Sequence, residues 1–505
     1  MRVFFNEDWI HFLWSRQNEK ITEKELKDFI FQYKNTTITD FAFNVNGTVS
    51  SSPSAVLETW IDKYNATEEN GEKVDYKNTF CALAYDLYER QKIDVYQVWF
   101  ETCKEVGINP WLSFRMNDCH ASVGKNELRK STQVEKFSSS WISAHRKSVG
   151  YFDCCYDYSK KCVRDLMLAY IKEQVERYDA YGIELDFSRE AYCFPVGKAE
   201  EGQAIMFDFI NNVREILLQI GNSRAKKIYL SVIGQANPLS CLRSGFDFSS
   251  IAKAGLIDYF VAAPRWETTN TDIPIELWKQ LLSHSVKFGC SQGLLVNGYI
   301  HTVKIADVAT DMGQAVANAH RGCDFIYLYN HFDIKEPGFE NISHENDFRQ
   351  KENIRYIYEN IGKVEDYEKW ERRIPVTHDD ATAMSEGIFK RFPLRASLAH
   401  FRIPCGKMDS ERNIYIHIVT NEDVNEDNIL VYANQKQAIL VKDSKDEIVW
   451  AKGKALTYCV QIQTDKILGV EVLSTNAEQF TINYVDALIP PLKTNKEKKE
   501  DENVF

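Results

Sequence analysis

Polar residues able to bind ligands or transfer protons stand directly after short apolar runs in this sequence. In residues 110–120, PWLSFRMNDCH, the apolar run ends in four such residues, Arg115, Asn117, Asp118 and His120. A buried parallel strand whose carboxyl end opens into a polar site has this pattern. A guanidinium, a carboxylate and an imidazole in one loop supply an anion-binding group and two groups that can carry protons.

The same change from apolar to polar residues recurs along the chain. The further candidates for catalysis or ligand contacts are Asp8, Asn44, Glu184, Asp186, Arg189 and Asn330. In a parallel α/β barrel, the carboxyl ends of the strands and the loops after them face one shared pocket. We therefore predict that these residues meet at one barrel mouth.

The residue types at this mouth favour a sugar as the ligand. Carboxylates, amides and arginines can bind hydroxyl groups, and aromatic side chains can cover the C–H faces of a sugar ring. The aromatic residues expected there are Trp9, Trp14, Trp266 and Tyr329. Asp118 and His120 could be metal ligands, but the cysteines and histidines of the chain form no zinc-binding spacing around them, so we expect no metal site.

Eight apolar, strand-like runs alternate with amphipathic segments of helical period. The runs are residues 3–8, 40–45, 111–114, 182–187, 227–232, 258–264, 293–298 and 324–330. This alternation is typical of parallel βαβ units, and eight such units favour a closed (β/α)8 TIM-type barrel over an open doubly wound sheet.

Local signals also predict where some helices begin and end. Thr22, with Glu25 three residues later, predicts a capping box at the start of a helix. Gly182 is expected to cap the end of the helix that precedes the fourth strand. A further helix is expected over residues 275–288, directly before the seventh strand.

The pattern of apolar, polar and charged residues divides the chain into three parts. Residues 1–372 hold the barrel, with long loops after its second and third strands. In residues 373–492, period-2 segments separated by short polar turns predict a smaller C-terminal β-sandwich. Because its polar residues form no cluster at a strand end, we expect it to support the barrel or an assembly interface, such as a homodimer. Residues 493–505 are charged and almost free of apolar residues, so a disordered tail is expected.

Composition disfavours several kinds of partner and location. The 505 residues carry a formal net charge of −12 and no basic stripe, which argues against nucleic acid and anionic membrane surfaces. The first residues reach a carboxylate pair too soon for a signal peptide or a membrane span. Twelve cysteines without a CxxC pair favour reduced thiols and the cytoplasm, or secretion or the periplasm if a leader was removed. No GxGxxG or GxxxxGK(S/T) motif follows a strand, so neither a dinucleotide nor a nucleotide triphosphate is expected as a ligand.

Five segments resemble the inverting exo-sialidases of glycoside hydrolase family 156. The segments are NEDWIHFLWSR, PWLSFRMNDCH, GIELDFSREAYCF, PRWETTNTDIPIELW and DFIYLYN, and together they span the expected barrel. The resemblance implies a (β/α)8 catalytic domain, release of terminal sialic acid from glycoconjugates with inversion, and no cofactor. It matches Asp8 and His120 to the catalytic pair, and Arg115, Arg189 and Asn330 to substrate-binding positions.

The chemistry of sialic acid agrees with these positions. Its carboxylate, on the anomeric carbon, needs fixed cationic donors, and a guanidinium presents paired donors that match a carboxylate. The same carboxylate would repel an anionic nucleophile, whereas a base that acts through one water molecule avoids that repulsion and inverts the configuration. We prefer Asp8 as the base and His120 as the acid, although the sequence also permits the reverse.

Two other functions remain open on the sequence alone. Glu184 and Asp186 stand two apart on one strand and therefore point to the same face. They could be the acid and its partner in a glycosidase acting on neutral sugars, or a structural pair that holds Arg189 in place. A carbohydrate-binding barrel without turnover is the remaining alternative, and the joint presence of Asp8 and His120 speaks against it.

Overall fold

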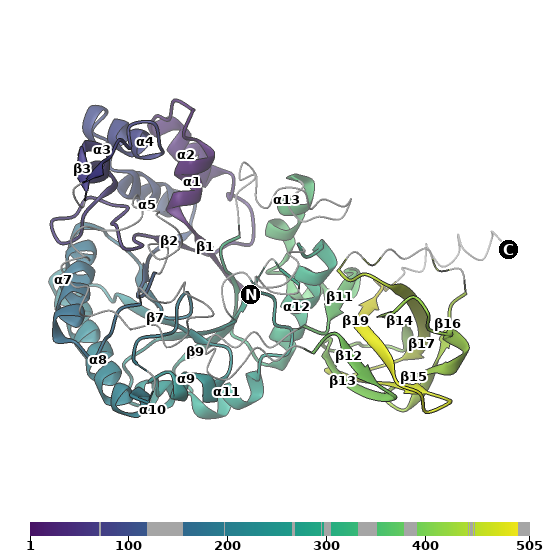
Figure 1. Ribbon diagram of the computed structural model, residues 1–505. Coiled ribbons are helices and arrows are strands. Elements are labelled where there is room, and N and C mark those ends of the chain that lie inside the picture. Colours follow the sequence, from purple (N-terminus) through teal and green to yellow (C-terminus); the bar gives the residue numbers. More distant parts are fainter. Residues whose placement is uncertain are drawn as a thin grey trace.

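In the computed structural model, a closed parallel barrel is followed along the chain by an antiparallel β domain (Figure 1). The residues that the structure describes are 1–69, 72–118, 155–195, 197–264, 268–293, 295–296, 305–331, 351–377, 391–442, 444, 448 and 450–492. In Figure 1 the barrel runs from purple to teal, the β domain from green to yellow, and helix α12 (Val308–Arg321) lies between them.

The barrel is built from eight parallel strands. They are β1 (Arg2–Glu7), β2 (Asp40–Asn44), β5 (Asn109–Arg115), β6 (Gly182–Asp186), β7 (Tyr229–Gln235), β8 (Tyr259–Ala263), β9 (Lys287–Gln292) and β10 (Phe325–Leu328). Hydrogen-bonded neighbours follow the closed order β1-β10-β9-β8-β7-β6-β5-β2. The predicted (β/α)8 fold class is therefore confirmed, because β1 pairs in parallel with both β2 and β10 and leaves no open edge.

Helices surround these strands (Figure 1). Besides α12 they are α1 (Trp9–Ser15), α2 (Glu23–Phe31), α5 (Val95–Glu105), α7 (Lys161–Arg177), α8 (Ala199–Ser223), α9 (Pro238–Arg243), α10 (Phe248–Lys253), α11 (Ile275–Leu281) and α13 (Lys351–Asn360). The predicted capping box is present, since Glu25 Oε2 accepts from the backbone N–H of Thr22 at 2.9 Å. In the part of the chain described above, no helix is both long and apolar enough to cross a membrane.

The seventh strand lies earlier in the chain than predicted. β9 has the sequence KFGCSQ, whereas the sequence predicts a strand over 293–298 and a helix that continues to residue 288. A Cβ on Gly289 would lie 2.4 Å from the Phe325 ring of β10. The strand therefore carries small residues because a neighbouring aromatic ring fills the space, and this hides its strand signal. Leu295, from the predicted run, is buried in the loop that follows.

The helix before β6 also ends earlier than predicted. α7 ends at Arg177, and Gly182 is the first residue of β6 rather than a helix cap. A Cβ on Gly182 would lie 2.3 Å from the Trp111 ring. This glycine is therefore required for the close packing of an aromatic residue inside the barrel.

The long segment after β2 folds against α7. It contains α3 (Trp60–Asn65), the short strands β3 (Glu68–Glu69) and β4 (Glu72–Lys73), α4 (Cys81–Tyr85) and the π-helical turn η1 (Asp86–Arg90). The hydroxyl groups of Ser50 and Tyr170 lie 2.8 Å apart, and the Ser52 hydroxyl donates to Gln174 Oε1 at 2.7 Å. These bonds tie the insertion to the helix layer. The second long loop falls largely in residues 119–154, outside the described residues.

The C-terminal domain is the predicted antiparallel β-sandwich. Its strands are β11 (Arg372–Pro375), β12 (Leu394–Ala396), β13 (Leu398–Pro404), β14 (Arg412–Thr420), β15 (Ile429–Ala433), β16 (Lys436–Leu440), β17 (Lys454–Ile462), β18 (Ile467–Ser474) and β19 (Phe480–Ile489). β16 connects the two layers, because its first half pairs with β15 and its second half with β17. The sandwich has its own apolar core, separate from that of the barrel. The predicted tail, residues 493–505, lies outside the described residues.

A buried group of charged residues joins the two domains where α12 packs on β11. Arg373 Nε donates to Asp307 Oδ2 at 3.0 Å, and Arg373 Nη1 donates to Asp486 Oδ2 at 2.6 Å. His417 Nδ1 lies 2.6 Å from the other oxygen of Asp486. We call Asp307, Arg373, His417 and Asp486 the interdomain cluster.

Candidate active site at the carboxyl end of the barrel

Aromatic rings close the amino end of the barrel interior. Phe4 packs against Trp111 and Phe325, with ring centroids 5.2 and 4.8 Å away, and Tyr259 completes the group. The interior is therefore a packed core and not a pore, as in other barrels of this type. A ligand site has to lie above this layer, towards the carboxyl ends of the strands.

A polar layer lies directly above the aromatic one, and Glu184 is its centre. Glu184 Oε1 accepts from Tyr327 Oη at 2.7 Å, from Ser113 Oγ at 2.8 Å and from Asn6 Nδ2 at 3.4 Å. Burial raises the pKa of Glu184 to about 8, although hydrogen bonds from Tyr327 and Ser113 oppose the rise. Glu184 is therefore mainly protonated at neutral pH and belongs to the barrel interior.

Asp186, two residues further along β6, fixes the turn that carries Arg189. Its Oδ1 accepts from the backbone N–H groups of Ser188 and Arg189, both at 2.8 Å. Its Oδ2 accepts from Tyr329 Oη at 3.0 Å. Burial raises the pKa of Asp186 above its ordinary value. These bonds agree with the interpretation of Asp186 as a structural residue that holds Arg189 in place.

Asp8 stands where β1 ends and α1 begins, and both of its oxygens accept hydrogen bonds. Oδ1 caps the helix by accepting from the backbone N–H of Ile10 at 3.0 Å, and Oδ2 accepts from Arg115 Nη2 at 2.6 Å. His11 Nε2 lies 3.9 Å from the same Oδ2. Burial alone would raise the pKa of Asp8, but the charges of Arg115, His11 and Arg189 outweigh it and hold the pKa well below its usual range.

Arg115, the last residue of β5, lies between two carboxylates. Besides Asp8, its other terminal nitrogen lies 3.6 Å from Asp118 Oδ2, and the side chains of Asp8 and Arg115 are only 5% and 4% exposed. Burial lowers the pKa of Arg115, and Arg189 lowers it further, but the attraction of Asp8 and Asp118 outweighs both. Two guanidinium groups therefore act on the same buried carboxylate. We call Asp8, Arg115, Asp118, Asp186 and Arg189 the mouth cluster.

Asn44 and Asn330 are the two amide candidates, and both are buried at strand ends. Asn44 Nδ2 makes a long contact of 3.5 Å with the backbone carbonyl of Ser113, and the backbone carbonyl of Asn44 accepts from Tyr96 Oη at 2.7 Å. Asn330 follows β10 in the left-handed region, with φ of 52°, which asparagine tolerates better than most residues. Its neighbour His331 is also buried, and burial lowers the pKa of that imidazole to about 3.

His120, the predicted partner of Asp8, lies outside the described residues, as does Trp266. Of the other aromatic residues, Trp9 is not at the mouth, and that prediction is wrong: Trp9 is buried against Phe12 and Trp99, with centroids 5.6 and 5.2 Å away. Trp9 was expected at the mouth only because it follows Asp8 directly in the sequence. Tyr329 does reach the site, through its bond to Asp186.

Two residues of this region, Ser113 and Tyr327, were not singled out by the sequence, and both donate to Glu184. Asn46, two positions after Asn44, donates through Nδ2 to the backbone carbonyl of Arg115 at 2.9 Å. Ser113 and Tyr327 alternate with apolar residues in their strands, so a period-2 count of inward positions would have found them. Among the described residues, no group of three His, Cys, Asp or Glu side chains is placed to hold a metal ion.

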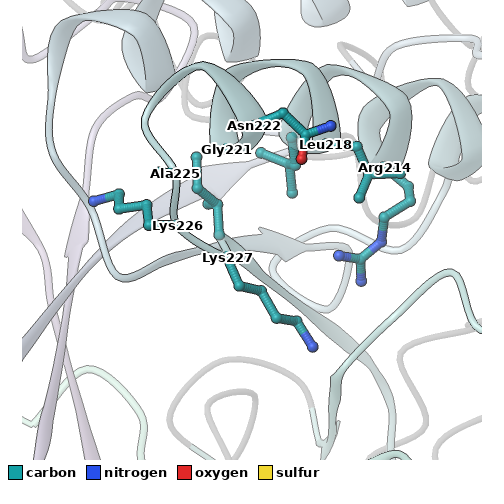
Figure 2. A pocket seen from close by; sticks show the side chains of 9 residues that line it. Arg214, Leu218, Gly221, Asn222, Ala225, Lys226 and Lys227 are labelled. Carbon is teal, nitrogen blue, oxygen red and sulfur yellow. The ribbon is translucent and has the colours of Figure 1, made fainter.

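A hollow of about 380 Å³ lies at the opposite end of the barrel, beside the start of β7 (Figure 2). Arg214, Lys226 and Lys227 line it together with apolar residues such as Leu217. Arg214 and Lys227 each lie 2.7 Å from Asp258, and Lys226 forms an ion pair with Asp179. These cations pair with carboxylates that are partly exposed to solvent. The hollow therefore lacks the buried charged groups that the mouth cluster brings together.

Comparisons with known proteins add little to this geometry. No family model and no curated protein matches the chain. The solved structures that align with it include a family 18 N-acetylglucosaminidase from Paenibacillus barengoltzii (12% identity, TM-score 0.31, 57% of this chain and 68% of that chain), a bacterial fucosidase (11%, 0.38, 94% and 92%), and alpha-L-fucosidase isoenzyme 1 from Paenibacillus thiaminolyticus (10%, 0.35, 94% and 96%). Likeness at these levels carries no argument about activity.

Proposed function

We propose that the protein is a glycoside hydrolase, an exo-sialidase that releases terminal sialic acid from glycoconjugates with inversion of configuration. The observation that carries this proposal is the mouth cluster, in which Arg115 and Arg189 act on the buried carboxylate of Asp8 in an acidic protein. Two buried guanidinium groups at a barrel mouth suit a sugar that carries its own carboxylate.

In this proposal, Arg115 and Arg189 bind the carboxylate on the anomeric carbon of the sugar. The turn held by Asp186 presents Arg189, and β5 presents Arg115, so both groups come from rigid elements. Asn330 and Asn44 are proposed to bind polar groups of the same sugar. Sialylated glycans are therefore the proposed partners.

The proposed reaction is a single displacement. Asp8 takes a proton from a water molecule, and the oxygen of that water forms a bond to the anomeric carbon from the face opposite the leaving group. The bond from the anomeric carbon to the glycosidic oxygen breaks, its electron pair stays on the leaving oxygen, and His120 protonates that oxygen. Asp8 then returns its proton to solvent, and His120 regains one. No enzyme group forms a covalent bond to the sugar.

The glycosidase that uses Glu184 and Asp186 on neutral sugars is less well supported. Glu184 Oε1 already accepts three hydrogen bonds within the polar layer, below the level of Arg115 and Asp186. Asp186 has both oxygens engaged in holding the turn and Tyr329.

A panel of fluorogenic substrates tests the proposal. We expect hydrolysis of an α-sialoside and at most trace hydrolysis of matched glycosides of galactose, glucose, fucose and N-acetylglucosamine. A proton NMR time course started within a minute of mixing should show β-sialic acid first. Preferential hydrolysis of a neutral glycoside would favour the Glu184 and Asp186 alternative, and early α-sialic acid would exclude inversion. Binding without turnover would favour the non-catalytic barrel.

A further inference from the structure

We propose that Arg115 holds the catalytic base Asp8 in an inactive ion pair in the free enzyme, and that the carboxylate of the substrate releases Asp8 by replacing it on the guanidinium. This inference rests on the proposed function. It deepens that function by making the anionic group of the sugar a requirement for catalysis as well as for binding.

The contacts of Asp8 are those of a structural ion pair rather than of a ready base. The bond to Arg115 is 2.6 Å long, both side chains are buried, and Oδ1 caps α1. A general base works best when its pKa lies near the operating pH. The charges of Arg115, His11 and Arg189 instead hold the pKa of Asp8 well below its usual range, which makes it a weak base.

The contacts of Arg115 point to the same competition. Its guanidinium faces Asp8 at 2.6 Å and Asp118 at 3.6 Å. A sugar carboxylate that makes a two-point contact with Arg115 has to displace one of them. Asp8 is the closer partner, and it accepts through one oxygen only, so a two-point ligand contact can replace it.

Replacement would change Asp8 in the direction that catalysis needs. Loss of the Arg115 hydrogen bond removes the main attraction that lowers its pKa, and a second carboxylate close by raises it by like-charge repulsion. The backbone N–H of Ile10 still holds Oδ1, so Asp8 keeps its position while Oδ2 becomes free to accept a proton from water. A neutral sugar brings no carboxylate and leaves the ion pair intact, so it is rejected in the chemical step as well as in binding.

The test is calorimetric binding of free sialic acid to the 505-residue protein and its Asp8→Asn variant. Asn keeps the size of Asp and is an equally good N-cap, and a thermal melt checks that the variant is folded. Because the competing carboxylate is gone, we expect Asp8→Asn to bind sialic acid roughly tenfold more tightly than wild type at pH 7. In wild type near pH 5, titrations in two buffers of different ionisation enthalpy should show proton uptake on binding, and Asp8→Asn should abolish that uptake.

Asp118→Asn is the matched control. It removes the same charge from the same guanidinium at 3.6 Å instead of 2.6 Å and leaves Asp8 in place. We expect a smaller gain in affinity and unchanged proton uptake. Equal or weaker binding by Asp8→Asn, or proton uptake that persists in it, would overturn the inference. Failure of the proposed function looks different: neither wild type nor variant would bind sialic acid, and no sialoside would be hydrolysed.

Discussion

The mouth cluster and the interdomain cluster are both buried groups of charged residues, but they are built differently. In the interdomain cluster one guanidinium, Arg373, lies between Asp307 and Asp486 and over the Trp450 ring, 5.0 Å from its centroid. His417 and Tyr484 complete the bonds of Asp486. In the mouth cluster, Arg115 and Arg189 repel each other around Asp8.

The difference separates a cluster that stabilises the fold from one that is suited to a ligand. A buried charge is tolerated when opposite charges and hydrogen bonds satisfy it, as in the interdomain cluster. In the mouth cluster the like charges of Arg115 and Arg189 repel each other, and an incoming anion can relieve that repulsion. The predictions below test whether the two clusters can be disabled independently.

The largest expected effect is on turnover, after a change in the mouth cluster. Asp8→Asn and His120→Ala should each lower kcat for an α-sialoside on the order of 10²–10⁴-fold, because each removes a proton-transfer group. Initial rates and a thermal melt of each variant give the measurement. Retention of more than a tenth of the wild-type kcat would remove that residue from the catalytic pair.

The next largest effect should fall on stability alone, after a change in the interdomain cluster. Arg373→Met leaves Asp307 and Asp486 buried without their shared cation, which should lower the free energy of unfolding by about 3–5 kcal/mol. Chemical denaturation measures it, and Arg373→Lys, which keeps the charge, should lose less. kcat of the folded variant should stay within about twofold of wild type. A large loss of kcat with intact stability would show that the two clusters are coupled.

The same cluster predicts how stability depends on acid. Burial raises the pKa of Asp486, but Arg373 and His417 outweigh it and lower the pKa well below its usual range. A group with a lowered folded-state pKa contributes stability above its unfolded pKa of about 3.9 and loses it as pH falls further. Below about pH 4, the stability difference between wild type and Arg373→Met should therefore shrink, as measured by denaturation at several pH values.

A smaller effect is expected from Arg115→Lys and Arg189→Lys. Lysine keeps the positive charge but cannot make a two-point contact with a carboxylate. The fall in kcat/KM should therefore correspond to a loss of about 1–3 kcal/mol of transition-state binding. The same assay with both variants gives the result. Values within twofold of wild type would mean that the arginine concerned does not bind the sugar carboxylate.

The smallest effect on activity is expected for Glu184→Gln. A glutamine resembles the protonated form that burial favours, with the pKa of Glu184 at about 8, so kcat should stay within about twofold of wild type. The glycosidase alternative predicts a loss on the order of 10²-fold or more.

Stability should respond to the same substitution with a definite sign. The pKa of Glu184 is raised from about 4.5 to about 8 on folding, so the folded state binds one more proton between these values and wild type loses stability as pH rises through them. Glu184→Gln should therefore gain stability relative to wild type from pH 5 to pH 8. A difference that does not change with pH would contradict the buried, protonated state.

The sequence by itself determined the fold class and most of its elements, because the signals are local. Alternation of strand and helix periods predicted the barrel, the capping box of Thr22 fixed the start of α2, and period-2 runs predicted β14 to β19. It also placed Asp8, Arg115 and Arg189 at strand ends, since a change from apolar to polar residues is visible without the fold.

Only the tertiary structure decided which of these residues touch and what their contacts do to their charges. Asp8 and Arg115 are 107 residues apart in the chain, and their ion pair depends on the register across β1, β2 and β5. β9 escaped prediction because Phe325 of another strand occupies the space beside Gly289. Burial also raised the pKa of Glu184, and it placed Trp9 in the apolar core instead of at the barrel mouth. A local pattern records a residue's own preference, whereas contacts and burial come from residues far along the chain.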